Sequence, residues 1–308
     1  MEHRSRNHHA AEDDGRNARL IAALVIILPA AGTAVALTRA ALGDFRLWYL
    51  WMFLGMYALT LFGVEGGFHR LFAHRAYKTG KFMKGLLIIL GSMAAQGPVI
   101  WFAAVHRTHH ASSDEPDDPH SPYIRGNRKL GGLRGLWHSH LGWMLEHDVR
   151  TAADWVRLVP DLARDAFVFR MHLLYPVWVL LGLLLPAALG ALLGGLEGAL
   201  GGFLWGGMVR LFAVHHIMWS IGSLCHISGS RPFDTGDQSR NNALIGLLSF
   251  GVGWHNNHHA FQSSARIGLR WWQIDINYYL IRALEIVGLA REVKRPAPEV
   301  IRARGSMA

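Results

Sequence analysis

Long apolar runs separated by short polar loops dominate the pattern of the 308-residue chain. Residues 20–37 carry no charge and would form a helix of about 27 Å, close to the roughly 30 Å thickness of a bilayer core. Such runs predict transmembrane helices, because lipid offers no partner to an exposed backbone. We therefore expect an all-α integral membrane protein with four spans, at residues 20–37, 47–64, 173–196 and 198–219.

Polar and aromatic residues within these runs refine the prediction. Trp48 and Trp51 open the second run, as aromatic side chains do at a membrane interface. The last run contains Arg210, His215 and His216, and lipid does not solvate such groups, so we expect them to face a bundle or a site. The first run is longer than the apolar core of a signal peptide, which favours a retained span.

Positive charge is distributed unevenly between the loops. Arg39, Asp44 and Arg46 are the only charges between the first two runs, and Glu197 is the only one between the last two. Lys and Arg are frequent elsewhere, so the positive-inside rule predicts that both termini are cytoplasmic. Within a membrane domain at 19–290 we expect a cytoplasmic helical cap at 65–172 and 220–290, and mobile ends at 1–18 and 291–308.

Composition supports a membrane protein. Hydrophobic residues make up 51% and charged residues 17% of the chain, which disfavours a soluble enzyme, a disordered chain or a long coiled coil. The net charge of +9 would suit nucleic acid, but beside apolar runs it favours basic loops facing anionic lipid. We expect the bilayer as partner, and no nucleic acid. A single cysteine, Cys225, excludes an intramolecular disulfide.

The placement of the 19 histidines is the strongest chemical signal. Isolated histidines are usually surface or core residues, and we read His3, His8, His9, His120 and His147 in this way. Eight others form three clusters, each beside an apolar segment. The clusters are His69 and His74; His106, His109 and His110; and His255, His258 and His259.

The spacing within the clusters predicts metal binding. Residues i, i+3 and i+4 share one face of a helix, while adjacent residues diverge by about 100°, so one cluster can serve two metal ions. His69 and His74 do not share an α-helical face. They would reach one centre only if the helix ended between them, or each would serve a different metal.

The number of histidines narrows the chemistry. Eight ligands exceed the roughly four of a structural zinc site, and no His-Glu-x-x-His motif is present. Two redox metals on neutral ligands at a membrane surface suit oxygen activation on an apolar substrate.

The clusters also constrain the topology. Residues 85–105 carry no charge and are long enough to cross a bilayer, although Gln96-Gly97-Pro98 interrupts them. His74 and His106 flank this segment and must lie close together to share a site. We therefore expect the segment to be re-entrant, interfacial or buried beneath the cap.

From about residue 47 to 289 the chain resembles the membrane fatty acid desaturases, in particular the stearoyl (Δ9) branch of bacterial type. The resemblance lies in Gly-Phe-His-Arg-Leu-Phe-Ala-His-Arg (67–75), Val-His-Arg-Thr-His-His (105–110), Asp-Asp-Pro-His-Ser-Pro (117–122), His-Leu-Gly-Trp (140–143), Gly-Trp-His-Asn-Asn-His-His-Ala-Phe (253–261), Ser-Ala-Arg (264–266) and Arg-Trp-Trp-Gln-Ile-Asp (270–275).

This resemblance implies a ninth ligand, His226, ahead of Gly-Ser-Arg-Pro-Phe (229–233). It implies a cytoplasm-facing diiron site that uses O2 and two electrons to form a cis double bond, at C9–C10 of a C16 or C18 acyl chain. By analogy Gln96, Trp101 and Trp219 would line the substrate tunnel; the alternative is interfacial aromatics and a capping amide. No haem-binding His-Pro-Gly-Gly is present, so electrons would come from a separate ferredoxin or cytochrome b5-like protein. The expected location is a bacterial inner membrane.

Departures from the family pattern keep alternatives open. Gly222 stands where relatives commonly have an Asn that holds a metal-bound water, and Val252 stands where Glu is common. Gly97, Ala104 and Val105 replace polar residues that meet CoA in animal enzymes, which leaves the acyl carrier, CoA or lipid, open. The alternatives are a membrane hydroxylase or ketolase with the same metals, a histidine-rich metal transporter, and an inactive lipid-binding relative.

Overall fold

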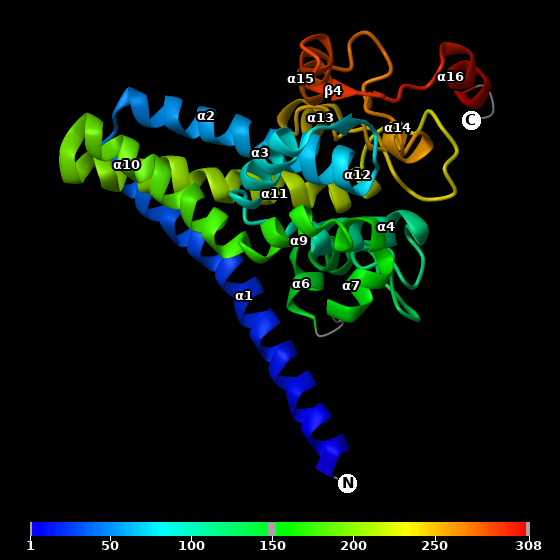
Figure 1. The fold of residues 1–308 in the computed structure, drawn as a ribbon, viewed down its shortest axis with the longest axis horizontal. Helices are drawn as coiled ribbons and strands as arrows, with labels where there is room; N and C mark the ends of the chain where they lie inside the picture. The colour runs from blue at the N-terminus through cyan, green and yellow to red at the C-terminus, as the bar shows by residue number, and fades with distance from the viewer. Residues whose placement is uncertain (1, 147–151, 306–308) are drawn as a thin grey trace.

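The computed structural model describes residues 2–146 and 152–305, and nearly all of the elements in these ranges are helices (Figure 1). Three helical stretches are long and apolar enough to cross a membrane: Gly15–Ala41, Leu47–Ala73 and Tyr175–Ile227. The predicted membrane protein is thereby supported. His147 lies outside the described residues, and so do the side chains of His3, His8 and His9.

The elements divide into those that join end to end as long helices and a group of separate, shorter ones. The long helices are α1 (Glu2–Ala41), α2 (Leu47–Phe62), the π-helix η1 (Gly63–Ala73), α10 (Tyr175–Gly202), the π-helix η3 (Phe203–Val209) and α11 (Arg210–Gly222). The first short elements are β1 (Lys78–Thr79), α3 (Lys81–Ser92), α4 (Val99–Ala111), β2 (Ile124–Arg125), β3 (Arg128–Lys129), α5 (Gly132–Trp137), the π-helix η2 (His138–Gly142) and α6 (Trp143–Leu145). The others are α7 (Ala152–Leu158), α8 (Pro160–Ala163), α9 (Ala166–Leu173), α12 (Leu224–Ile227), α13 (Ala243–Leu248), α14 (His255–Ala260), α15 (Ile276–Ile286), β4 (Ala290–Arg291) and α16 (Pro298–Gly305).

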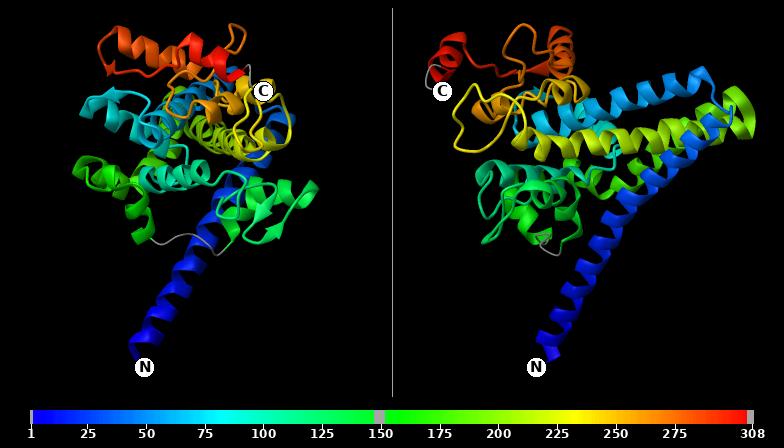
Figure 2. Two further views of the ribbon diagram at one scale, coloured as in Figure 1. Left: turned by 90° about the vertical axis from the view of Figure 1, so that its right-hand side faces the viewer. Right: turned by 180° about the vertical axis from the view of Figure 1, so that it is seen from behind.

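The long helices and the short elements occupy different parts of the molecule. Helices α2, α10 and α11 run side by side, and α1 crosses them obliquely (Figures 1 and 2). The short elements gather at the end of these helices that is remote from the turns joining them. We call this group of short elements the cap.

Helix α10 contains a reversal of the chain. The backbone leaves the helical conformation at Gly194 and at Gly195, whose φ of +60° favours glycine. The two arms then pack closely: a Cβ added to Gly190 would lie 2.1 Å from the carbonyl oxygen of Gly198. The sequence predicts two separate spans with Glu197 between them. In the structure the chain reverses three residues earlier, at Gly194, within one helical stretch.

The segment at residues 85–105 does not form one continuous helix. Helix α3 ends at Ser92, a bend containing Gly97 at φ +85° follows, and α4 begins at Val99. The bend returns the chain, so that the Nε2 atoms of His74 and His106 lie 2.7 Å apart. The chain therefore folds back within this segment, and among the described residues the segment is not one of the helices long and apolar enough to cross a membrane.

Buried Arg210 and His215 hold this bend. The carbonyls at the end of α3 have no partner within the helix, as at every helix C-terminus. The Arg210 guanidinium donates to the carbonyl oxygens of Met93 at 2.5 Å and Gly182 at 2.6 Å, and His215 Nε2 lies 2.8 Å from the Ala94 oxygen. The polar residues of the last apolar run therefore serve the interior, as the sequence predicts.

A core of buried apolar side chains fixes η1 against the cap. Phe68 of η1, Leu87 of α3, Ala103 of α4 and Ile281 of α15 belong to this cluster and are fully buried. The segment after residue 289 also contacts the cap: β4 pairs antiparallel with β1, and the Lys294 amide donates to the Ala76 carbonyl at 2.9 Å. Elements far apart in the sequence thus pack against the residues on either side of the first histidine cluster.

Replacing Arg210 by Met tests the anchoring of the bend. We expect a loss of stability on the order of 2 kcal/mol, because buried carbonyl groups lose their only charged donor. Thermal unfolding of the detergent-purified protein measures the change. The matched control is Arg128→Met in exposed β3, and equal unfolding temperatures for the two variants would contradict the assignment.

Candidate dimetal site

All nine histidines expected as ligands meet where η1 joins the cap, and there their ring nitrogens form two groups. Within each group the nitrogens that could bind a metal lie within 4.8 Å of one another. The first group comprises His69, His74, His106, His110 and His258, and the second comprises His109, His226, His255 and His259. Two of the clusters in the sequence divide between the groups, as the divergence of adjacent helical positions predicts.

In the first group, Nε2 atoms face Nε2 atoms. The distances are 2.7 Å for His74–His106, 3.0 Å for His106–His110 and 2.9 Å for His110–His258. A neutral imidazole carries one N–H, so rings protonated at Nδ1 would direct lone pairs at each other. Converging lone pairs repel unless a cation lies between them, and the group therefore fits a metal ion.

The π-helix η1 explains how His69 and His74 join one group. The backbone amide of His74 donates to the carbonyl of His69, five residues earlier, at 3.0 Å, which is the π-helical bonding pattern. The ring centroids of the two histidines lie 4.7 Å apart. The helix ends at Ala73, between the two histidines, as one of the two alternatives from the sequence required, and its widened turns bring the rings together.

In the second group, carboxylates hold the outer nitrogens. The Nδ1 atoms of three histidines lie close to aspartate oxygens, which fixes the proton on Nδ1 and leaves Nε2 to face the metal. The distances are 3.0 Å for His109–Asp118, 2.9 Å for His226–Asp114 and 2.7 Å for His259–Asp237. The Nε2 atoms of His109 and His259 are buried without a hydrogen-bond partner among the described residues, as expected for metal-ligand atoms.

Among the described residues, one carboxyl group lies behind a ligand of the first group. Glu65 Oε2 lies 2.9 Å from His69 Nδ1, one helical turn earlier in the chain. Glu65 is 1% exposed and lies in the wall of the cavity described below. It therefore places a buried acid directly behind a first-group ligand.

Electrostatics differ between the groups: burial keeps first-group rings in the form that binds cations, whereas in the second group burial is outweighed by Asp118, which raises the pKa of His109. Burial lowers the pKa of the His106, His110 and His258 rings well below the usual value, so these rings are neutral at pH 7. Burial opposes ionisation of Asp118, but the adjacent His109 outweighs it and holds the pKa of that carboxyl below its usual range. The neutral imidazoles of the first group and the carboxylate-backed imidazoles of the second both suit a divalent transition metal, which would displace a ring proton from His109.

Buried polar contacts fix the elements that carry the ligands. Arg70 of η1 donates to Asp275 Oδ1 at 2.7 Å and to the Ala265 carbonyl at 2.6 Å. Asn257, between the histidines of α14, donates to Gln273 Oε1 at 2.9 Å. The Arg-Trp-Trp-Gln-Ile-Asp segment thus orients two ligand-bearing helices.

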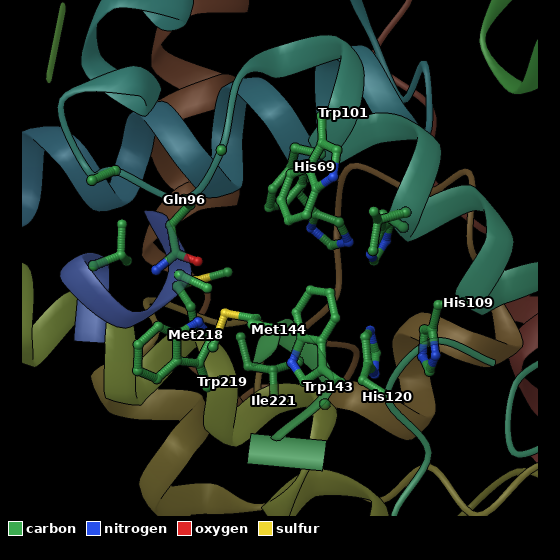
Figure 3. Close-up of a pocket in the computed structure, with 18 of the residues that line it drawn as sticks. His69, Gln96, Trp101, His109, His120, Trp143, Met144, Met218, Trp219 and Ile221 are labelled. Carbon is green, nitrogen blue, oxygen red and sulfur yellow. The ribbon is translucent and has the colours of Figure 1, made fainter. Parts of the chain in front are cut away.

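A cavity of about 440 Å³ adjoins both groups. Its wall includes His69 and His106 of the first group and His109 and His255 of the second, while the remainder is mainly apolar. Gln96, Trp101 and Trp219 all line it, as the resemblance implies. In Figure 3, Gln96, Met218 and Trp219 lie at one end of the cavity, and His109 and His120 lie at the other.

The structure adds residues that the sequence analysis missed. Helix α1 contributes Ala18, Ala22 and Val25 to the cavity wall, and His120 lies in the wall beside His109. The two departures from the family pattern, Gly222 and Val252, also line the cavity. The sequence signal for Asp118 was its place in the Asp-Asp-Pro-His motif, whereas no comparable signal marked Glu65, Asp114 or Asp237.

Comparison with known proteins agrees with this geometry. Residues 45–286 match the family model described as fatty acid desaturase. The chain belongs to the fatty acid desaturase family. A hex-5-enoyl-[acyl-carrier protein] acetylenase of Moorena producens is 45% identical over 287 residues, which cover 90% of this chain and 87% of that protein.

Two further desaturase relatives act on lipid-linked chains, according to their names. An sn-1 stearoyl-lipid 9-desaturase of Anabaena variabilis is 38% identical over 80% of this chain and 85% of its own length. A chloroplastic palmitoyl-monogalactosyldiacylglycerol delta-7 desaturase of Arabidopsis thaliana is 39% identical over 79% of this chain and 61% of its own length. The match to the desaturase family therefore spans most of the chain.

Replacing Asp118 by Asn tests the carboxylates behind the second group. Without the carboxylate, His109 loses the partner that fixes its orientation, and we expect metal affinity to fall about 10- to 100-fold. Metal content after dialysis against graded chelator measures the loss. Asp117→Asn, at the exposed neighbouring position, is the control and should behave as the wild type.

Proposed function

We propose that the chain is an O2-dependent diiron acyl desaturase that introduces a cis double bond, at C9–C10, into a saturated C16 or C18 chain. The observation that carries the proposal is the pair of histidine groups facing one apolar cavity. The ligands of the two irons are His69, His74, His106, His110 and His258 for the first, and His109, His226, His255 and His259 for the second.

The reaction balances with one O2 per double bond. Two C–H bonds of the acyl chain supply two electrons and two protons, a donor supplies two more electrons, solvent supplies two protons, and O2 leaves as two waters. Irons held by these histidines would activate O2, which is the oxidant that breaks the unactivated C–H bonds. The protein chain contributes neutral ligands, a dry cavity and a fixed position for the substrate.

Positioning must come from shape, because a saturated chain has no polar group near the reacting carbons. The aromatic and apolar wall formed by Trp101, Trp143 and Trp219 excludes water and restricts the acyl chain. Gln96 is a polar residue at the end of the cavity remote from His109 in Figure 3. We assign Gln96, Trp101 and Trp219 to substrate binding.

The topology follows from the same proposal. We infer four crossings, with the two arms of α10–α11 as the third and fourth, supported by the reversal at Gly194 and Gly195. The cap, the iron site and both termini then lie on the cytoplasmic side of a bacterial inner membrane, where residues 19–290 form the membrane domain. A separate ferredoxin or cytochrome b5-like donor would supply electrons, and basic loops would favour an acidic partner.

Rival functions predict different products. A hydroxylase or ketolase would release oxygenated lipid from the same site. The similarity to an acetylenase favours a second candidate, oxidation of an existing double bond to a triple bond. The histidine groups are closed off in the cap rather than spread along a path across the membrane, so the structure gives no support to a metal transporter.

Expression in a desaturase-deficient bacterial host tests the proposal. Membrane fatty acids of cells producing the wild type should contain new cis-monounsaturated chains, and purified protein should hold about two irons per chain. His258→Ala, which removes one first-group ligand, should abolish both. Folded, iron-loaded protein that receives electrons and yields no unsaturated product would refute the assignment, and it would favour the inactive lipid-binding relative. Oxygenated products would favour the hydroxylase.

Filling the cavity beside α1 tests its role in chain selection. Ala22→Phe should reduce conversion of C18 more than that of C16 chains, because the larger side chain occupies space that the longer chain needs. The product ratio in cells measures the effect. Leu24→Phe, on the exposed face of α1, is the control. Equal loss for both chain lengths would show that the part of the cavity beside α1 does not select the acyl chain by its length.

A further inference from the structure

His120 stands at the point where the cavity meets the second group. Its ring centroid lies 4.4 Å from that of His109, and its Nδ1 lies 3.8 Å from Asp118 Oδ1, the carboxylate that also holds His109. His109, Asp118 and His120 each offer an atom that could bind a metal within 4.8 Å of the other two. His120 therefore lies next to the carboxylate that contacts a histidine of the second group.

The His120 ring lacks a hydrogen bond at Nδ1 among the described residues, because Asp118 Oδ1, its charged neighbour, lies too far away at 3.8 Å. Its Nδ1 is buried and makes no hydrogen bond with any described residue, although the side chain is 14% exposed, and the residue lines the cavity. A buried polar atom without a partner is costly unless something else satisfies it. In Figure 3 the side chains of His120 and Trp143 lie beside each other in the cavity wall.

Gly222 provides the room for this ring. A Cβ added at Gly222 would lie 3.0 Å from His120 Nδ1 and 3.1 Å from its Cε1, which is close enough that the ring would have to shift by a few tenths of an ångström. The backbone at Gly222 is helical, so the glycine is not required by its φ angle. The physical reason for glycine here is the close approach of the imidazole.

We propose that His120 is a positioning residue of the dimetal site, whose ring hydrogen-bonds a small ligand that approaches the second group from the cavity. Gly222 is the residue that permits this placement. His120 is grouped with His109 and Asp118 but not with the four nitrogens of the second group, and we therefore assign it a role through the ligand rather than as a further ligand of that metal. This inference rests on the proposed function only in taking the two groups as iron sites.

Nitric oxide binding to the ferrous protein tests the placement without turnover. Full-length wild type and variants are loaded with iron in lipid nanodiscs, the iron content is measured, and anaerobic titration is followed by electron paramagnetic resonance. His120→Ala should keep about two irons per chain and raise the dissociation constant for nitric oxide about fivefold, the equivalent of one hydrogen bond. Gly222→Ala should weaken binding in the same direction by displacing the ring, and His120→Asn should restore part of the affinity.

The control and the contrary outcomes separate this inference from the proposed function. His140→Ala removes a partly buried histidine of the same region, bonded to His216 and Ser223, and should leave nitric oxide affinity unchanged. Unchanged affinity in both His120→Ala and Gly222→Ala overturns the inference alone. Loss of one iron in His120→Ala also overturns it, because His120 would then be a direct ligand. A wild type that binds no iron contradicts the proposed function and this inference together.

Discussion

The convergence of imidazole lone pairs on two points is the constraint on which the rest of the structure depends. In the first group, Nε2 atoms from three separate segments approach to about van der Waals contact or closer, with distances between 2.7 and 3.0 Å. Neutral rings held this way repel one another without a cation. The surrounding protein must therefore impose the arrangement, and much of the buried polar structure has this role.

Three structural devices bring the segments together. The π-helix η1 turns His69 and His74 to one side, the bend between α3 and α4 returns the chain to His106, and the short helix α14 inserts His258 from the opposite side. Each device exposes backbone or polar groups that ordinary helices would satisfy. Buried side chains such as Arg70 and Arg210 supply the missing hydrogen bonds.

The two groups differ in electrostatic surroundings. Three aspartates stand behind the second group, whereas Glu65 is the one carboxylate paired with a ligand of the first among the described residues. Carboxylates behind histidine ligands make them more basic, so the second group is the better electron donor to its metal. The cavity reaches both groups, and the two metals would consequently meet the substrate with different properties.

The sequence by itself determined the helical membrane class and eight clustered histidines, because hydropathy and helical spacing are local properties. His226 was identified through the family resemblance, and the return of residues 85–105 followed from the requirement that His74 and His106 share a site. The sequence could not divide the histidines between two groups, since that division depends on a π-helix and on which ring faces which. Nor did it identify Glu65, Asp114 and Asp237, or the part of α1 in the cavity wall, since these lie far from the site along the chain or lack a distinctive spacing. Only the tertiary structure decided these points, because hydrogen-bond partners and cavity walls are formed between segments that packing alone brings together.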